Sequence, residues 1–271
     1  MVMRSNPVTQ LQPPKLGTPK SAKISYSLHE TGSLLVGDMF LSGYLNDCVQ
    51  MVEYFGPLRS FLLLKGGYER GANTETIDRV VAHATDTIAW AVKMRDDGYH
   101  QINTISFLSE WAALEAGNEN VVAAIIGTVR NAAEAAADKF QKGRFDAGAW
   151  PWSDDQCLEI AQKLDQKAKD KTQDRGWNAS GRLVVLFGWL GVTLEIDPVS
   201  AEKFNEASMI RNVIVHRYGR LRASDICRTP HLAGWEGKTL PMTAERMREY
   251  NEAMVAIHLA ISNAIHAKGW K

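Results

Sequence analysis

The chain has few cysteines and no net charge. Its 271 residues include three cysteines, and 31 basic residues are balanced by 31 acidic ones. Cys48, Cys157 and Cys227 lack the paired spacing of a zinc site, and their odd number does not fit a disulfide framework. We therefore expect three buried thiols. The neutral total gives no global reason to expect nucleic-acid binding, although it leaves room for a local basic patch.

Several familiar motifs are also missing. The sequence contains no P-loop, no dinucleotide-binding fingerprint and no G-x-S-x-G elbow, which argues against the commonest nucleotide-binding and hydrolase classes. His258 and His266 share one predicted helix, but no carboxylate or thiol completes a metal-ligand set around them. We predict neither a metal site nor a cofactor.

No hydrophobic run is long enough to cross a bilayer. Residues 183–192, LVVLFGWLGV, are apolar on every side but too few for a membrane span, and they favour a helix on the axis of the core. The first 30 residues hold four prolines and no apolar run typical of a signal peptide. We predict a flexible tail over residues 1–30, a cytoplasmic protein and no membrane partner.

What the sequence has in abundance is helical periodicity. Apolar residues make up 45% of the chain and recur at three to five positions in several segments, with no sustained strand alternation. Gly56 with Pro57, and later Gly117, are interpreted as helix ends. The class predicted is all-α, with a flexible tail (1–30), an N-terminal helical extension (31–98) and a helical bundle (99–271).

One stretch combines a helix with reactive side chains, FNEASMIRNVIVHRYG at residues 204–219. At about 100° per residue it has one polar and one opposing apolar stripe, so it is expected to bury one side and expose the other. Asn212 and His216 are four apart, which allows the amide to orient the imidazole. The polar stripe comprises Asn205, Ser208, Asn212 and His216, and the apolar one Ala207, Ile210 and Ile214.

Arginines gather on this stretch and just after it. Arg211 lies near the apolar sector, where a guanidinium needs an anionic partner. Gly219 is a natural helix stop. Arg217, Arg220 and Arg222 follow with little acidic compensation, which indicates a local basic patch, or alternatively an ordinary solvated loop.

Arg211, Asn212, three apolar residues, His216, Arg217 and Tyr218 resemble the R-x-x-x-x-H-x-Y signature of the HEPN superfamily of helical ribonucleases. The tyrosine resembles that of the HepT-type toxins, whose nucleotidyltransferase antitoxins silence them by adenylylating it. The resemblance implies a HEPN-like four-helix bundle, here with additional N-terminal helices. It also implies a homodimer whose two motifs face each other, and metal-independent RNA cleavage.

The resemblance assigns roles to the residues of the motif. His216, Arg211 and Asn212 are the predicted catalytic residues, as proton carrier, phosphate holder and orienting amide. In the family an acidic residue of an earlier helix meets the motif's arginine, and Glu110 or Glu115 is a candidate. Arg217, Arg220 and Arg222 are predicted to bind RNA, and Tyr218 to be a modification site at the cleft mouth. These roles suit a toxin or antiviral defence effector.

Other interpretations of the same residues remain. In a structural interpretation His216 caps the helix end and Arg211 forms a packed ion pair, with Tyr218 as an aromatic anchor. The corresponding functions are a non-catalytic HEPN module that binds nucleotide or RNA or regulates a partner, or a structural helical scaffold. Arg95 and His100 repeat the arginine-to-histidine spacing, but they flank a predicted helix end and no tyrosine follows at the motif's offset.

Overall fold

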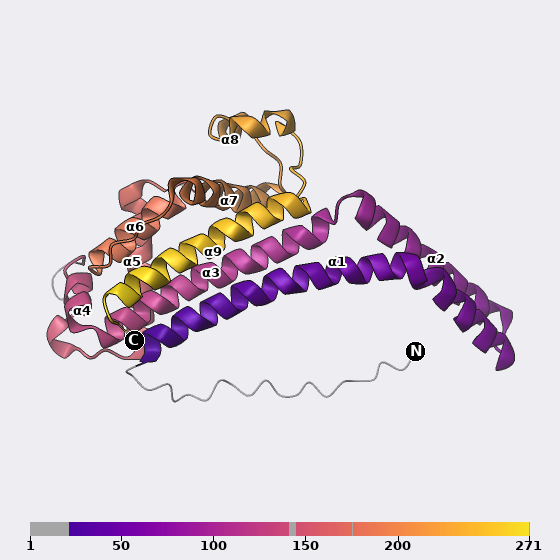
Figure 1. Ribbon diagram of the computed structural model, residues 1–271, viewed down its shortest axis with the longest axis horizontal. Coiled ribbons are helices and arrows are strands. Elements are labelled where there is room, and N and C mark those ends of the chain that lie inside the picture. Colours follow the sequence, from indigo (N-terminus) through magenta and orange to yellow (C-terminus); the bar gives the residue numbers. More distant parts are fainter. Residues whose placement is uncertain (1–21, 141–144, 175, 271) are drawn as a thin grey trace.

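A computed structural model describes residues 22–140, 145–174 and 176–270, and these are almost entirely helical (Figure 1). Within these ranges there is no strand, only one isolated antiparallel bridge between Arg220 and Thr239. The predicted all-α class is confirmed. The helices are α1 (Lys23–Glu69), α2 (Thr74–Asp96), α3 (His100–Thr128), α4 (Arg130–Ala137), α5 (Asp154–Thr172), α6 (Ala179–Trp189), α7 (Pro198–Arg217), α8 (Ala223–Ile226) and α9 (Ala244–Ala267), with short 3-10 helices η2 (Ala147–Ala149) and η3 (Pro230–Trp235).

Helix α3 is the axis of the core. It packs against α1, α5, α7 and α9, and buried side chains follow its whole length. Trp111 stacks on Phe204 of α7 with ring centroids 5.0 Å apart, and Phe107 lies 5.4 Å from Tyr250 of α9. Residues 183–192, expected on this axis, instead contribute α6, which packs between α5 and α7 and leaves Val184 exposed. All-round hydrophobicity therefore did not identify the central helix.

Two predicted helix breaks are close contacts between continuous helices. A Cβ atom on Gly117 would lie 2.2 Å from Thr31 Oγ1, so the missing side chain lets α3 approach α1. A Cβ atom on Gly56 would lie 2.7 Å from a side-chain carbon of Ile88, so α1 approaches α2 in the same way. Helix α1 continues through Pro57, although proline has no N–H to donate to a helical hydrogen bond.

The N-terminal boundary also differs from the prediction. Helix α1 begins at Lys23, so residues 23–30, assigned to a flexible tail, are helical. Ile24 and Leu28 from this part are buried in the main core, and Lys23 pairs with Asp154 of α5 at 2.6 Å. Residues 1–21 lie outside the described residues. The first half of α1 thus shares one core with the helices after residue 99.

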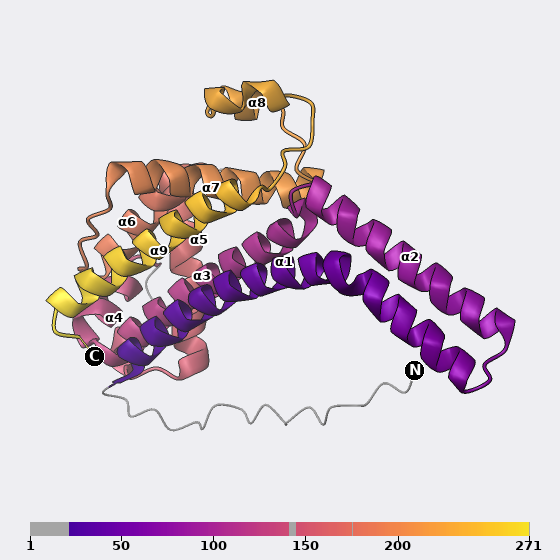
Figure 2. The ribbon, with the colours of Figure 1, turned by 45° about the vertical axis from the view of Figure 1, so that its right-hand side comes forward.

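Helices α1 and α2 form an antiparallel hairpin that extends beyond the bundle (Figure 2). Asn73 caps α2 by accepting a hydrogen bond from the N–H of Thr76 at 2.9 Å. Among the described helices, α1 included, none has the combination of length and apolar character that would cross a membrane. Cys48 of this hairpin is exposed, as is Cys227, so of the three thiols expected to be buried only Cys157 is.

A buried carboxyl lies where α1, α3 and α9 meet. Glu110 is 1% exposed, and its Oε1 has no hydrogen-bond partner among the described residues. Burial, and secondarily the charge of Asp38, raise its pKa to about 8, against the opposing effect of a hydrogen bond with Asn251. The neutral acid is therefore the form that suits the folded core near pH 7.

We predict that Glu110→Gln stabilises the protein at high pH and not at low pH. Because the folded pKa is about 8 and the ordinary value 4.5, this carboxyl favours folding fully below pH 4.5 and loses that contribution as pH rises through 8. Removing the charge should raise the free energy of unfolding at pH 9 by about 2–4 kcal/mol. Urea unfolding of both proteins from pH 4 to pH 9 measures the difference, and a pH-independent difference would contradict the assignment.

Candidate functional site

The motif helix α7 is more deeply embedded than its amphipathic pattern indicates. Asp197 caps it by accepting from the N–H of Ser200 at 2.9 Å, and its middle, residues 204–210, is buried on nearly all sides. Ser208, expected on an exposed polar stripe, is 6% exposed. Asn205 of the same stripe accepts a hydrogen bond from the N–H of Ser180 at 2.9 Å and so holds the first turn of α6. This half of the stripe is structural, and only its C-terminal half reaches solvent.

Arg211 has the anionic partner that its position requires. Its Nη2 donates to Glu115 Oε2 of α3 at 2.9 Å, and its Nη1 donates to Asn212 Oδ1 at 3.0 Å. The side chain is half-buried. Of the two acidic candidates, Glu115 is therefore the partner, while Glu110 lies in the core next to Asn251. Asn212 orients the arginine, and no hydrogen bond joins it to His216 among the described residues.

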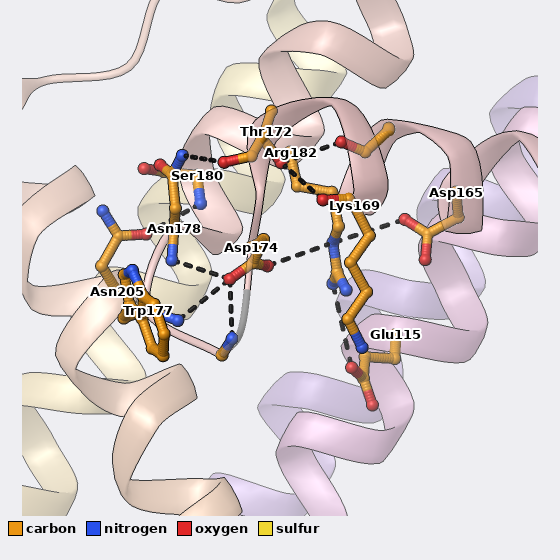
Figure 3. Close-up of polar contacts among 12 residues, drawn as sticks. Glu115, Asp165, Lys169, Thr172, Asp174, Trp177, Asn178, Ser180, Arg182 and Asn205 are labelled. Atoms are coloured by element: carbon orange, nitrogen blue, oxygen red, sulfur yellow. Dashed lines mark hydrogen bonds and ion pairs between the residues drawn. The ribbon is translucent and has the colours of Figure 1, made fainter.

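A second arginine lies beside this pair. Figure 3 shows the guanidinium of Arg182 among three carboxylates, which come from α3, α5 and the turn before α6. Its nitrogens lie 3.4 Å from Asp165, 3.8 Å from Glu115 and 3.9 Å from Asp174. Burial raises the pKa of Asp165 more than Arg182 lowers it. We call Arg182, Arg211 and these three acids the carboxylate cluster. All of its members except Asp174 line a hollow of about 270 Å³.

The turn between α5 and α6 is built on Asp174. Its Oδ1 accepts hydrogen bonds from the N–H groups of Gly176, Trp177 and Asn178 at 2.8, 2.9 and 2.9 Å (Figure 3). Gly176 has φ +92°, and a Cβ atom there would lie 2.0 Å from Asn212 Nδ2. The turn therefore requires glycine at this position and packs directly on the amide that orients Arg211.

The C-terminal end of α7 presents two free side chains. Tyr218 has φ +52° and Gly219 φ +78°, so the chain leaves the helix at the residues where the sequence predicts its end. The side chain of Tyr218 is 90% exposed, which excludes a packed aromatic anchor in this chain. His216 is exposed and makes no hydrogen bond or ion pair within the part of the chain that the structure describes.

The arginines after His216 line a second hollow, of about 520 Å³, which we call the basic pocket. The guanidinium of Arg217 already has an anionic partner there, because it donates to both carboxylate oxygens of Asp225 at 2.7 and 3.1 Å. Burial of Asp225 opposes its ionisation, but the hydrogen bonds from Arg217 and from the N–H of Arg222 outweigh it and lower its pKa. The lining comprises Arg217, Tyr218, Arg220, Leu221, Arg222, Ala223, Glu236, Gly237 and Thr239.

Two contacts anchor the segment that forms the far wall of the basic pocket. Arg228 stacks over the ring of Trp177 at 3.5 Å, beside the Asp174 turn. His231 Nε2 lies 3.2 Å from Glu206, a buried acid of α7 that also accepts from the Tyr250 hydroxyl at 2.8 Å. The long segment between α7 and α9, predicted as a loop, is thus held against the bundle and contains α8 and η3.

The predicted residues therefore fall into two neighbouring places. Arg211 belongs to the carboxylate cluster and Asn212 adjoins it, whereas Arg217, Tyr218, Arg220 and Arg222 line the basic pocket. His216 lies between them along α7 and lines neither of these hollows. Arg182 and Asp174 were missed, because nothing local marks residues that meet α3 and α7 only in the folded chain. The sole hint was Asp174 two residues before Gly176, a pairing typical of side-chain-capped turns.

We predict that Asp174→Ala weakens the whole cluster. The substitution leaves three backbone N–H groups without their acceptor and removes one acid from Arg182, so it should cost about 2–4 kcal/mol of unfolding free energy. Asp174→Asn keeps an acceptor oxygen and should cost less than half as much. Urea unfolding measures both, with the exposed Asp155→Ala as the matched control, expected below about 1 kcal/mol. Equal losses in Asp174→Ala and Asp155→Ala would contradict the role of the turn.

Comparison with known proteins adds no relative to this geometry. No family model matches the chain, and neither the curated proteins nor the solved structures contain a match.

Proposed function

We propose that the chain is a metal-independent endoribonuclease of the HEPN type, acting in the cytoplasm as a toxin or antiviral defence effector. The observation that supports it best is the arrangement of two side chains on α7. Arg211 is held in one orientation by Glu115 and Asn212, while His216, one and a half turns further on, is exposed and unpaired among the described residues. A fixed cation and a free imidazole on one helix are the two groups that RNA cleavage without a metal requires.

The proposed reaction uses the 2′-hydroxyl of RNA as the nucleophile. Its oxygen forms a bond to the adjacent phosphorus while the bond from phosphorus to the 5′-oxygen breaks. One histidine accepts the proton of the 2′-hydroxyl, and an acid returns a proton to the departing 5′-oxygen. The products are a 2′,3′-cyclic phosphate and a 5′-hydroxyl. His216 is suited to either proton transfer, since the ordinary pKa of imidazole is near neutrality.

Arg211 supplies the positive charge for the phosphate. A guanidinium has five N–H donors, and Glu115 and Asn212 engage one nitrogen each, so donors remain for phosphate oxygens. The half-buried position strengthens that interaction relative to bulk water. Glu115 thus acts as a positioning residue that fixes where the cation lies, and Asn212 assists it.

A second copy of α7 completes the proposed site. One chain offers one histidine of the motif, and Arg211 and the arginines beyond His216 line separate hollows. Two-fold pairing of motif helices would bring a second imidazole to the same phosphate and so supply both a base and an acid. The proposal therefore includes a homodimer through the exposed C-terminal half of α7.

The basic pocket is the proposed path for the RNA backbone. Arg220 and Arg222 make no ion pair within the described residues, in contrast to Arg217. Unpaired arginines beside a 520 Å³ hollow provide the local positive potential that the neutral chain lacks as a whole. Tyr218 stands at the same pocket, where its exposed hydroxyl would be open to a modifying enzyme.

A second candidate is a HEPN module that binds nucleotide or RNA without cleaving it. The observation that favours it is the pairing of Arg211 with Glu115, since a neutralised cation stabilises a phosphorane less than a free one. In that case the basic pocket is the whole of the functional site. The remaining alternative, a structural scaffold, has the weaker support, because unpaired arginines and an exposed tyrosine line one pocket there.

We predict RNA cleavage in the presence of a chelator that depends on His216 and Arg211. In EDTA the wild-type chain should cleave a mixed RNA pool to 2′,3′-cyclic phosphate ends, and His216→Ala and Arg211→Ala should each lower the rate at least ~100-fold. Denaturing gels and mass spectrometry of the fragment ends measure this. Circular dichroism and sedimentation confirm that helicity and mass are unchanged.

The chain provides its own matched controls. Arg95 and the exposed His83 lie on α2 and line neither the carboxylate cluster's hollow nor the basic pocket, so Arg95→Ala and His83→Ala should keep full activity. Folded wild-type protein that binds RNA but leaves every RNA intact would support the binding module instead. If the folded protein neither binds nor cleaves RNA, the structural scaffold is the interpretation that remains.

We predict that Tyr218→Phe retains cleavage but escapes silencing. The tyrosine lies at the mouth of the basic pocket, where an adenylyl group would block RNA while its phosphate meets Arg220 and Arg222. Coexpression with a nucleotidyltransferase encoded beside this chain, followed by mass spectrometry, should show an adduct of adenosine monophosphate on the wild type and none on the variant. Loss of cleavage in a folded Tyr218→Phe protein would refute this role.

A further inference from the structure

Helix α1 exposes an unusual amount of apolar surface. Among the described residues, 16 of the 25 large apolar side chains that are exposed belong to this one helix. Most of them lie between residues 34 and 68, a span with few charges. Scattered exposed apolar residues are ordinary, but a contiguous set on one element marks an interaction surface.

The exposed residues follow the spacing of a coiled coil. Seven positions alternate by three and four, which is the a/d repeat of a helix that packs lengthwise against another helix. The six large side chains among them are each 52% to 66% exposed, and the seventh, a cysteine, is exposed as well. We call these positions the α1 seam. They are Leu41, Tyr44, Cys48, Met51, Phe55, Leu58 and Leu62.

The rest of the hairpin exposes fewer large apolar side chains, and on α2 these are Val81 and Trp90. The opposite side of α1 packs on α2, with Val49 buried and Gly56 against Ile88. The outer face of α2 is polar and needs no cover. It carries Glu75, Asp78, Arg79, His83 and Asp86, all exposed.

The chemistry of the α1 seam favours a protein helix over a lipid surface. No seam position is charged, and the charges beside it, Asp47 and Arg59, are one of each sign, whereas Glu53 pairs with Arg95 of α2. Helices that lie on membranes usually border their apolar face with several lysines or arginines, which attract anionic headgroups. Such a border is missing here.

The area available is that of a stable dimer. The seam is bordered at intervals of fourteen and seven residues by Phe40, Tyr54 and Phe61, which are 61% to 75% exposed. At about 150 Å² for a large side chain, slightly more than half exposed, the six large seam residues and these three aromatics present on the order of 800 Å² per chain, the amount that one partner buries in a standard interface. An uncharged a/d repeat is also self-complementary, because it meets the same repeat in a second copy.

We propose that two copies of this chain associate through the α1 seam, hairpin against hairpin. This interface is independent of the proposed ribonuclease, because α1 and α7 lie on opposite sides of the bundle in both views (Figures 1 and 2). It joins two subunits without bringing their motif helices together. The seam side chains are exposed in the single chain, so substituting them should break the association and leave each subunit folded.

Sedimentation equilibrium of the purified full chain tests the interface. The double substitution Met51→Glu with Phe55→Glu places two charges per helix at the centre of the seam, and it should halve the mass relative to wild type at micromolar concentration. The 30.1 kDa chain makes that change easy to measure. Val199→Glu is the matched control, since Val199 is 75% exposed on α7 and outside the seam, and it should keep the wild-type mass.

The native cysteines give a second readout. Cys48 lies on the seam, Cys227 is exposed elsewhere and Cys157 is buried. In wild type Cys48 should react with a thiol reagent at least ~10-fold more slowly than Cys227, because the partner covers it. In Met51→Glu with Phe55→Glu the two thiols should react at similar rates. Peptide mapping of the labelled protein assigns each rate.

Four outcomes overturn the proposal. They are a wild-type monomer at all concentrations, a mass unchanged by the double substitution, a Cys48 that is equally reactive in both proteins, and a wild-type monomer that floats with phosphatidylglycerol vesicles through residues of the seam. The last would assign the seam to lipid. Because the double substitution leaves α7 untouched, RNA cleavage measured in parallel reports on the ribonuclease separately, so the two proposals fail independently.

Discussion

Glu115 is the contact on which the arrangement of the motif helix depends. Its carboxylate accepts from Arg211 of α7 at 2.9 Å and lies 3.8 Å from Arg182 of α6, so one side chain of the central helix ties two peripheral helices together. A carboxylate between two guanidiniums is well stabilised, and removing it would leave two partly buried cations facing each other. The orientation of α7, and with it the direction of Arg211, follows from this pair of contacts.

The turn around Asp174 extends the network of Glu115, Arg182 and Arg211. Asp174 holds the turn before α6 through three backbone hydrogen bonds, and the turn places Gly176 against Asn212. Arg182 contacts Asp174 on one side and Glu115 on the other. The cost of burying these charges is offset because each acid meets a guanidinium or backbone donors. Positions separated by about 60 to 100 residues thus act as one unit, with Arg211 at its outer edge.

The sequence predicted what depends on neighbours along the chain. The end of α7 just before Gly219 is local and is present, and the capping box of Ser153 with Gln156 and the cap Thr243 are likewise set by neighbours along the chain. The need of Arg211 for an acid also followed from its position on the helix. The identity of that acid required family resemblance, which offered Glu110 and Glu115 without separating them.

The predictions that were wrong share a physical cause. Gly56 and Gly117 were interpreted as helix ends because glycine weakens helices, but here it allows close approach between helices, and the partner that decides this is distant in sequence. Residues 183–192 are apolar all round, yet hydrophobicity alone does not say which helix other helices surround. Arg182 and Asp174 carry no local sequence signal, because their roles depend on contacts with α3 and α7 that form only in the folded chain.

The separation of paired and unpaired charge along α7 bears on how the protein could work. Arg211 has Glu115 as its counter-charge, which favours rigidity, whereas Arg220 and Arg222 make no ion pair within the described residues, which favours an anionic ligand. Along the chain, His216 lies between the paired Arg211 and the arginines without an ion pair. A ligand drawn to the unpaired arginines would therefore pass the imidazole before it reached the fixed guanidinium.

The opposite placement of the α1 seam and the motif helix limits the assemblies that the two proposed interfaces allow. Each interface is isologous, so each has its own two-fold axis, and a subunit that uses both is joined to two different neighbours. If the axes intersect at right angles the assembly closes as a tetramer, an intersection at about 60° or 45° closes a larger ring, and axes that do not intersect give an open chain. Because only the contact through α7 would build the catalytic pair, the seam would set how many such pairs are held together without altering any one of them.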